Sequence, residues 1–211
     1  RRCRLLGDRE EGLLAAVLAL AGTTLFVWRT ATDLPLLAAT WWWTAYASAA
    51  LAVGAWRRSS RLVALGLGLL ALATAKWMFM DTLVTAMDDR YGDDLVVLNW
   101  QAGAGVTLAI LLLWGRSVLK RAAAALDGAL AWMQHVWFPL AALLLLWAGS
   151  FEIDRYFELP FGRRLANRQQ AMQMAYSIWW SLCAVGCLVA GFALTHAVLR
   201  YLALAVFGVT L

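Results

Sequence analysis

This sequence has few charged side chains for its length. Only 15% of its 211 residues are Asp, Glu, Lys or Arg, whereas 63% are hydrophobic, and the mean hydropathy is +0.68. A soluble globule of this size cannot keep so much apolar surface out of water. The composition therefore excludes a soluble protein and places the chain in a lipid bilayer.

Cysteine is also scarce. The three cysteines, Cys3, Cys183 and Cys187, do not form a disulfide framework. Cys183 and Cys187 stand four residues apart on one helix face, a spacing that suits a metal, but His196 is more than two helical turns further on. Small side chains are typical of contacts between membrane helices. We therefore interpret both as packing residues beside Gly186, and we predict no metal and no cofactor.

The chain lacks an initiating Met and a readable signal peptide, and Leu211 stands inside an apolar run. A natural membrane protein rarely stops inside a span. We therefore expect this chain to be a piece of a longer protein.

Long apolar runs make up most of the sequence. A helix needs about 20 apolar residues to cross a hydrocarbon layer of ~30 Å, and the runs lack the alternation of polar and apolar residues that indicates strands. We predict an all-α, polytopic transmembrane helix bundle that forms a single domain, residues 1–211. About seven spans are expected, at residues 12–28, 35–56, 62–80, 95–115, 130–149, 170–194 and 198–211, the last of them truncated.

Lys and Arg are unevenly distributed among the connections. Residues 1–11, 57–61 and 116–121 contain four, three and three of them on one side of the bilayer, whereas residues 29–34 and 81–94 contain one each on the other. Positive residues are retained in the cytoplasm, so we predict a cytoplasmic N-terminus. Topology alone explains the net charge of +5, and we predict no nucleic-acid partner.

The stretch from Ser150 to Gln173 interrupts the apolar pattern. It contains three carboxylates, four arginines, four aromatic residues and three glutamines. The predicted topology places residues 150–168 outside the membrane, against the charge bias. We interpret the beginning of this stretch as a short amphipathic element at the interface.

Polar side chains inside apolar spans are costly and often mark functional sites. The predicted topology brings several of them to one membrane face, where they would form a binding pocket for a polar headgroup: Lys76, Asp81, Asn99, Gln101, Glu152, Arg155, Gln170 and Gln173. The structural alternative is that Lys76 extends to the interface, the amides bond between helices, and the loop charges pair with one another.

An enzymatic role is a second possibility. Glu152 and Asp154 would then be the acid and base of a membrane-embedded transferase that acts on a polyprenyl-linked sugar. Asp81, or the aspartates at 88–89 and 93–94, would suit a divalent cation.

An ion or proton pathway is a third possibility. His135 and Gln134 lie together in the fifth predicted span, and Lys76 is the other ionisable group available to such a path. A hydrogen-bonded packing role for His135 is the alternative.

Tryptophan is abundant, with 13 residues. Trp28, Trp77, Trp100 and Trp147 fall near one predicted membrane boundary, which is typical of an aromatic belt. The deeper tryptophans suit either core packing or the lining of a path for a sugar or an isoprenoid tail.

The sequence also leaves open whether the chain contains an internal repeat. Gly54, a short loop and Arg61-Leu-Val-Ala-Leu in the second and third spans parallel Gly191, a short loop and Arg200-Tyr-Leu-Ala-Leu in the sixth and seventh. Both pairs cross the bilayer in the same direction, as in a parallel repeat. Chance similarity in an Ala- and Leu-rich chain is the alternative.

Two motifs resemble a known family. The segment Ser150-Phe-Glu-Ile-Asp-Arg-Tyr-Phe, followed by Gln169-Gln-Ala and a Trp-containing helix, resembles the bacterial multi-pass membrane proteins grouped as domain of unknown function 2339. Lys76 and Asp81, spaced K-x-x-x-x-D, look like a second signature of that group. The resemblance covers mainly residues 43–81 and 141–211. It implies an inner-membrane protein with many spans and gives weight to Glu152, Arg155, Gln170, Lys76 and Asp81 as a set, without implying an activity.

Together these features predict a non-enzymatic protein of the bacterial inner membrane that serves as a scaffold or carrier for the cell envelope. Its expected partners are membrane lipids, a lipid or glycolipid headgroup in the polar pocket, and an extracytoplasmic or membrane protein.

Overall fold

The computed structural model describes residues 2–83, 99–122, 133–163 and 166–210, and these residues form helices and no strand. The helices are α1 (Arg2–Asp33), α2 (Leu36–Trp56), α3 (Ser60–Lys76), η1 (Trp77–Asp81), α5 (Trp100–Ala122), α7 (Met133–Glu158), α8 (Pro160–Arg163), α9 (Arg168–Ala193) and α10 (Ala197–Thr210). The element η1 is a π-helical turn that continues α3. The all-α prediction is confirmed for the described part of the chain.

Within the described residues, five helices are long and apolar enough to cross a membrane: Leu36–Trp56, Ser60–Asp81, Trp100–Lys120, His135–Glu158 and Arg168–Ala193. The prediction of about seven spans is not confirmed. The described part of α1 is not among the five, and the apolar α10 has only 14 residues.

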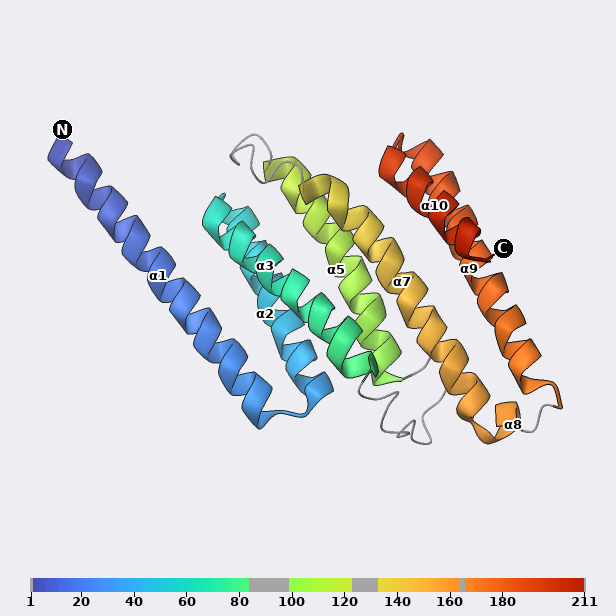
Figure 1. The fold of residues 1–211 in the computed structure, drawn as a ribbon. Helices are drawn as coiled ribbons and strands as arrows, with labels where there is room; N and C mark the ends of the chain where they lie inside the picture. The colour runs from blue at the N-terminus through green and yellow to red at the C-terminus, as the bar shows by residue number, and fades with distance from the viewer. Residues whose placement is uncertain (1, 84–98, 123–132, 164–165, 211) are drawn as a thin grey trace.

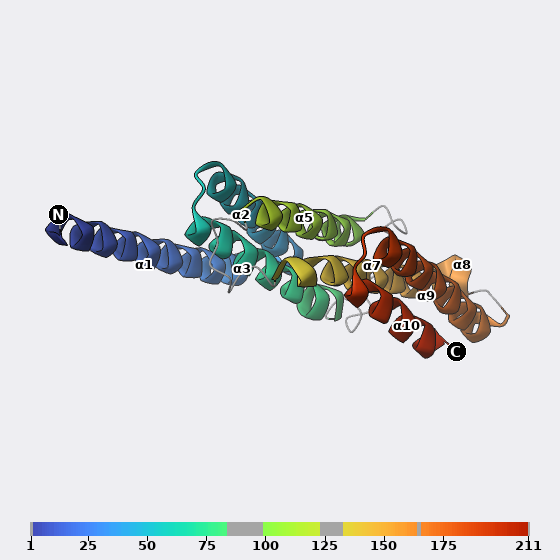
Figure 2. The ribbon, with the colours of Figure 1, turned by 90° about the horizontal axis from the view of Figure 1, so that it is seen from above.

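The helices stand in a row (Figure 1). Three antiparallel pairs pack closely, α2 with α3, α5 with α7, and α9 with α10, and α7 also contacts α9. Helix α1 lies at one edge of the row and diverges from its neighbours toward the N-terminus, which the view from above also shows (Figure 2). The turns α2–α3 and α9–α10 therefore lie at the same end of the row as the N-terminus of α7.

One apolar core joins α2, α3, α5 and α7. Its fully buried side chains include Leu70 on α3, Leu108 and Leu112 on α5, and Leu144 on α7. Because lipid tails are as apolar as leucine, close packing rather than escape from water holds these helices together in a bilayer.

Trp77 belongs to this core, and its predicted place in an interfacial aromatic belt is wrong. The side chain is only 1% exposed, and its indole N–H donates to the carbonyl oxygen of Gln101 at 3.2 Å. A Cβ on Gly105 would stand 2.7 Å from the Trp77 ring, so only glycine lets α5 approach the indole this closely.

The predicted end of the fifth span at residue 149 is wrong, since α7 continues to Glu158. Residues 150–158 are the last turns of a membrane-length helix and not a separate interfacial element. The helix persists because its charged side chains are bonded to α5, as described below. The fourth span was predicted to end at residue 115, but α5 also continues past that residue and includes Arg116 and Lys120.

The two tight turns have the same backbone. The N–H of Ser59 donates to the carbonyl of Gly54 at 2.9 Å, and the N–H of His196 donates to that of Gly191 at 2.8 Å. Each turn has one residue with positive φ directly before these donors, 52° in the first turn and 51° in the second. The second turn thus follows the first by 137 residues, the difference between 196 and 59.

The same offset relates two tryptophans. Trp43 on α2 donates its indole N–H to the hydroxyl of Thr30 on α1 at 2.7 Å, and Trp180 on α9 donates to Ser150 on α7 at 3.0 Å. The acceptors Thr30 and Ser150 are only 120 residues apart, so the offset of 137 holds for the turns and the tryptophans and not for the preceding helix. The shared turns and tryptophan bonds support a parallel repeat in which α7, α9 and α10 correspond to α1, α2 and α3. The turns set the register, so the predicted pairing of Arg61 with Arg200, an offset of 139, is wrong by two residues.

Candidate functional site

The π-helical turn explains the spacing of Lys76 and Asp81. A π turn closes hydrogen bonds from one residue to the fifth after it, and the N–H of Thr82 bonds to the carbonyl of Trp77 in this way. Residues five apart are therefore brought to one side of the helix, which they are not in a regular α-helix. The Nζ of Lys76 meets Oδ1 of Asp81 at 2.6 Å, and the two residues are 7% and 3% exposed.

Helix α2 completes the surroundings of the ammonium group. Besides Asp81, the Lys76 Nζ donates to the carbonyl oxygen of Leu36 at 2.6 Å and to the hydroxyl of Thr40 at 2.8 Å. Thr40 in turn donates to the other oxygen of Asp81. All three ammonium protons have acceptors inside the protein. The alternative in which Lys76 extends to the membrane interface is therefore wrong.

Arg155, on the last turns of α7, is buried against α5 with only 4% exposure. It donates from Nη2 to Oε1 of Gln101 at 2.7 Å and lies 3.5 Å from the carboxylate of Glu152, one helical turn earlier. Asn99 Nδ2 donates to both oxygens of Glu152, at 3.0 and 3.1 Å. A buried charge is tolerated where it is both paired and hydrogen-bonded, as it is here.

Asn99 and Gln101 join the two charge pairs at the start of α5. The Asn99 side chain accepts from the N–H of Ala102 at 2.8 Å, which is the usual role of Asn before the first turn of a helix. Gln101 Nε2 donates to the backbone carbonyl of Asp81 at 3.2 Å. We call the resulting cluster the polar network; its members are Thr40, Lys76, Asp81, Asn99, Gln101, Glu152 and Arg155.

Six of the eight residues predicted to form a binding pocket thus lie in one connected network. Thr40 is the member that the sequence prediction missed. A single threonine in an apolar helix carries little signal, since its hydroxyl usually bonds to the backbone of its own helix. The one available clue was its position one turn into the span that precedes Lys76.

Gln170 and Gln173 do not join the network, so this part of the predicted convergence is wrong. Both side chains are exposed on the first turns of α9, beside a shallow hollow lined by residues 166–170 and Gln173. Helix α9 turns its tryptophans toward α7 instead, where Trp179 donates to the carbonyl of Leu146 at 3.1 Å and Trp180 to Ser150. The glutamines consequently face away from α5.

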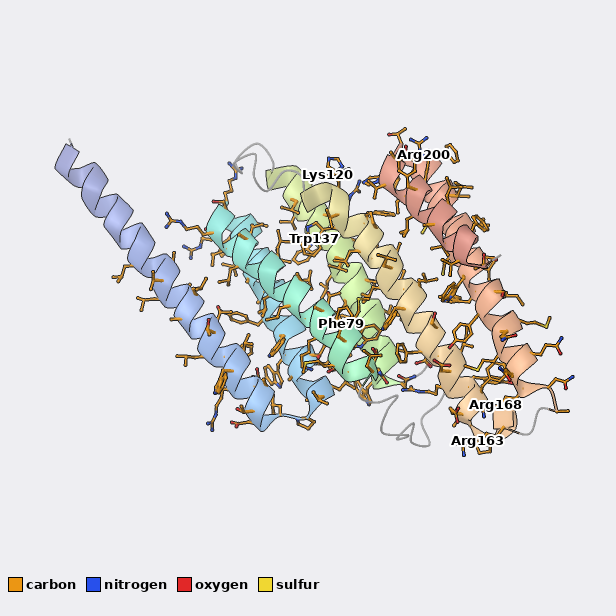
Figure 3. All side chains as sticks on the ribbon, in the orientation of Figure 1. Phe79, Lys120, Trp137, Arg163, Arg168 and Arg200 are labelled. Atoms are coloured by element: carbon orange, nitrogen blue, oxygen red, sulfur yellow. The ribbon has the colours of Figure 1, made fainter. Side chains whose placement is uncertain are left out.

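The remaining charges of this region pair with one another. Arg163 donates to Glu158 at 3.2 Å, and Arg168 binds the same carboxylate. Both arginines lie at the same end of the row as the polar network (Figure 3). The alternative prediction, in which the loop charges pair with one another, is confirmed for the carboxylate of Glu158.

A cavity of about 480 Å³ lies between α5, α7 and α9 next to the polar network. Its walls are mainly apolar and include Val106, Leu145 and the ring of Trp179, with Tyr156 at the side. Glu152 is the one charged residue among those that line it, so a mainly apolar cavity has a single carboxylate of the network in its wall.

Other predicted candidates do not come together. Asp154 follows Glu152 by two residues and so points from a different side of α7, and it does not line the cavity. His135 lies at the opposite end of α7 from the polar network, with the leucine core between them. The aspartates at 88–94 and the side chain of Gln134 are outside the described residues. Among the residues described, no three His, Cys, Asp or Glu side chains are grouped for a metal.

Comparisons with protein-family models, with curated proteins and with solved structures find no match to this chain, so the resemblance to domain of unknown function 2339 stays a prediction.

Proposed function

We propose that this protein is a non-enzymatic carrier or scaffold of the bacterial cell envelope that binds a glycolipid. In this proposal the headgroup meets Glu152 at the edge of the polar network, and the hydrocarbon chain lies in the cavity between α5, α7 and α9. The N-terminus of the chain is then cytoplasmic and the polar network lies near the outer face of the inner membrane.

The cavity next to Glu152 is the observation that supports this proposal most. Ligand sites are typically apolar hollows with a few placed polar groups, and this hollow offers an acyl or isoprenoid chain an apolar wall of Val106 and Leu145. The carboxylate of Glu152 already accepts from Asn99 and pairs with Arg155. The site is therefore held in place before a ligand arrives, which lowers the entropic cost of binding.

The chemistry of the lining favours a sugar over a phosphate. A carboxylate accepts hydrogen bonds from hydroxyl groups and repels a phosphate. Tyr156 and Trp179 add flat aromatic surfaces to the same cavity, on which the apolar face of a sugar ring can stack. The expected ligand is thus a lipid whose headgroup is rich in hydroxyl groups.

The two other functions have less support. A transferase would need an acid and a base near one substrate atom, yet Asp154 does not share the cavity with Glu152. A proton pathway from His135 to Lys76 would have to cross the core around Leu108, Leu112 and Leu144, which are fully buried and apolar.

Native mass spectrometry of the protein released from its own membrane tests the proposal. We expect the unaltered protein to retain a glycolipid and Glu152→Gln to retain at least tenfold less, because the amide keeps the shape of the side chain but loses its charge. Two matched controls, Asp154→Asn and Glu158→Gln, remove neighbouring carboxylates that lie outside the cavity and should keep the lipid.

The same preparation separates the alternatives. Equal loss in Glu152→Gln and Glu158→Gln would mean that general acidity, not the cavity, retains the lipid, and would overturn the proposal. Retention of a protein partner with no lipid would instead favour a subunit of an envelope complex. A retained polyprenyl-sugar that turns over, with loss of turnover in Asp154→Asn, would favour the transferase.

A further inference from the structure

The other end of the bundle contains a second cluster of polar side chains, which the proposed function does not use. His196, in the turn between α9 and α10, lies with its ring centroid 5.7 Å from that of His135 and 6.4 Å from that of Phe138, both on α7. The guanidinium of Arg116 on α5 lies over the Phe138 ring at 5.3 Å. Helices α5 and α7 and the turn between α9 and α10 thus converge at the Phe138 ring, and the positive charge of Lys120 on α5 also acts on His196. We call this group of Arg116, Lys120, His135, Phe138 and His196 the basic cluster.

Two of these groups are buried without a hydrogen-bond partner. Both ring nitrogens of His196 lack a partner although the residue is only 7% exposed, and the buried Nε of Arg116 lacks one too. A buried donor without a partner destabilises the fold, because it has lost its hydrogen bonds to water and gained none in the protein. The preceding turn, which has the same backbone, places Ser59 at the corresponding position. The fold therefore does not require a histidine there.

His196 also stands directly before the first residue of α10. The first N–H groups of a helix have no partner within the helix and bear a partial positive charge. Anions, phosphates above all, bind at such helix ends. The helix start, the unpartnered imidazole and the guanidinium are three independent sources of donors in one place.

No carboxylate that the structure describes compensates these charges. Among the side chains that the structure describes, which do not include those of residues 1–13, the acidic ones all lie at the far end, namely Asp33, Asp81, Glu152, Asp154 and Glu158. Lys120 and Arg200 both lie at the end of the bundle that holds the basic cluster, as Figure 3 shows. Asp127 is within residues 123–132, outside the described part of the chain.

We propose that the basic cluster is a binding site for a phosphate oxyanion, in which Arg116, Lys120 and His196 supply the donors beside the start of α10. The source of the phosphate is either a free anion or the headgroup of an anionic phospholipid. The site is independent of the glycolipid cavity, which lies at the opposite end of the membrane helices.

Protonation of His196 is coupled to such binding. Burial lowers the pKa of His196 from 6.5, and the positive charges of Arg116, His135 and Lys120 lower it further. Without a ligand the imidazole is therefore neutral at pH 7. A bound phosphate favours the charged imidazole and raises this pKa. By linkage, phosphate affinity increases as the pH falls through the higher pKa of the ligand-bound state and levels off below the lower pKa of the ligand-free state.

Nuclear magnetic resonance of ¹⁵N-histidine in the full chain, placed in phosphatidylcholine nanodiscs, tests the site. One arm titrates inorganic phosphate against chloride at equal ionic strength, and the other replaces about one lipid in five with phosphatidylglycerol. We expect the pKa of His196 to rise by about 1 unit or more in at least one arm. A response to inorganic phosphate identifies a free anion site, and a response to phosphatidylglycerol alone identifies a headgroup site.

Variants connect the response to the cluster. Arg116→Gln combined with Lys120→Gln should remove the shift, while Arg57→Gln, in the corresponding turn at the same end, should leave it unchanged. Lys120 is exposed, so Lys120→Gln alone keeps the fold and should weaken binding roughly two- to fivefold.

Three results would overturn the proposal. The first is that the pKa of His196 shifts in neither arm, both in the unaltered chain and in Asp127→Asn. That variant removes the acidic residue nearest to the cluster in the sequence. The second is an equal shift with chloride. The third is a full shift that survives the double variant.

Discussion

At the scale of single residues, the Lys76 and Asp81 pair shows how a membrane helix accommodates two charges. Neither charge reaches water, and each is held by partners on a second helix, Leu36 and Thr40. Bringing an ion out of water costs several kcal/mol, which attraction offsets only if every proton and lone pair is also satisfied. The π turn makes this possible by placing the carboxylate beside the ammonium.

Removing one member of the pair should therefore cost more than removing both. We expect Lys76→Met to lower the free energy of unfolding by about 3–5 kcal/mol, because Asp81 is left charged and buried. Lys76→Met combined with Asp81→Met should recover most of that loss. Reversible unfolding in mixed detergent micelles measures both.

The pair of Arg29 and Asp33 provides a matched control for this prediction. It has a comparable separation of 2.5 Å but is exposed, so Arg29→Met should cost less than about 1 kcal/mol. Equal losses of unfolding free energy in Lys76→Met and Arg29→Met would show that the buried pair stabilises the protein no more than the exposed pair does.

At the scale of elements, the two hairpin turns have the same backbone conformation although their residues differ. Each turn places a residue with a side chain in the left-handed region, Arg58 at φ 52° and Thr195 at φ 51°. Glycine is the usual residue there because it has no Cβ to collide with the backbone. The tight geometry persists because Gly54 and Gly191 let the next helix approach, with Val63 N and Arg200 N at 2.8 and 3.1 Å from where a Cβ would stand.

Glycine at these two positions should stabilise the protein. We expect Thr195→Gly to raise the free energy of unfolding by about 0.5–1 kcal/mol, and Arg58→Gly by less, because a β-branched residue tolerates positive φ worst. Unfolding in mixed micelles compares the two.

Ser59→Gly is the control for this pair. Ser59 has φ −96°, so glycine there only adds freedom to the unfolded chain and should lower stability by about 0.5–1 kcal/mol. A gain in all three variants would mean that backbone strain in the left-handed region is not the cause.

At the scale of the whole molecule, the two ends of the helix row differ in charge. The polar network and its carboxylates lie at one end, and the basic cluster and the two hairpin turns lie at the other (Figure 1). Positive residues are retained on the cytoplasmic side of a membrane. Both turns should therefore lie in the cytoplasm.

Single cysteines in a background with the three natural cysteines replaced by alanine test this arrangement. We expect Arg57→Cys and Lys120→Cys to resist a membrane-impermeant maleimide in intact cells, and Gln170→Cys to react. Gln170 is the outer probe because its side chain is exposed at the start of α9. The converse pattern would invert the topology, and a mixed pattern for residues 57 and 120 would contradict the arrangement of the row.

Local composition and spacing determined much of this protein without reference to tertiary contacts. Apolar runs near 20 residues specify helices that suit a bilayer wherever they occur, because backbone groups there must bond within the segment. The cost of polar groups in such runs likewise singled out Lys76, Asp81, Asn99, Gln101, Glu152 and Arg155, which the structure does bring together.

Tertiary structure alone decided the rest. The sequence indicated that the fifth span ends at residue 149, since charge follows. The helix α7 continues because Gln101 on α5, and Asn99 directly before α5, satisfy that charge. Gln170 and Gln173 have the same residue type as a network member but face away, because the tryptophans of α9 set its rotation. Thr40 and His196 gain their surroundings only from helices distant in sequence. Hydropathy reports the solvent that a residue prefers, whereas only packing between helices determines which neighbour replaces that solvent.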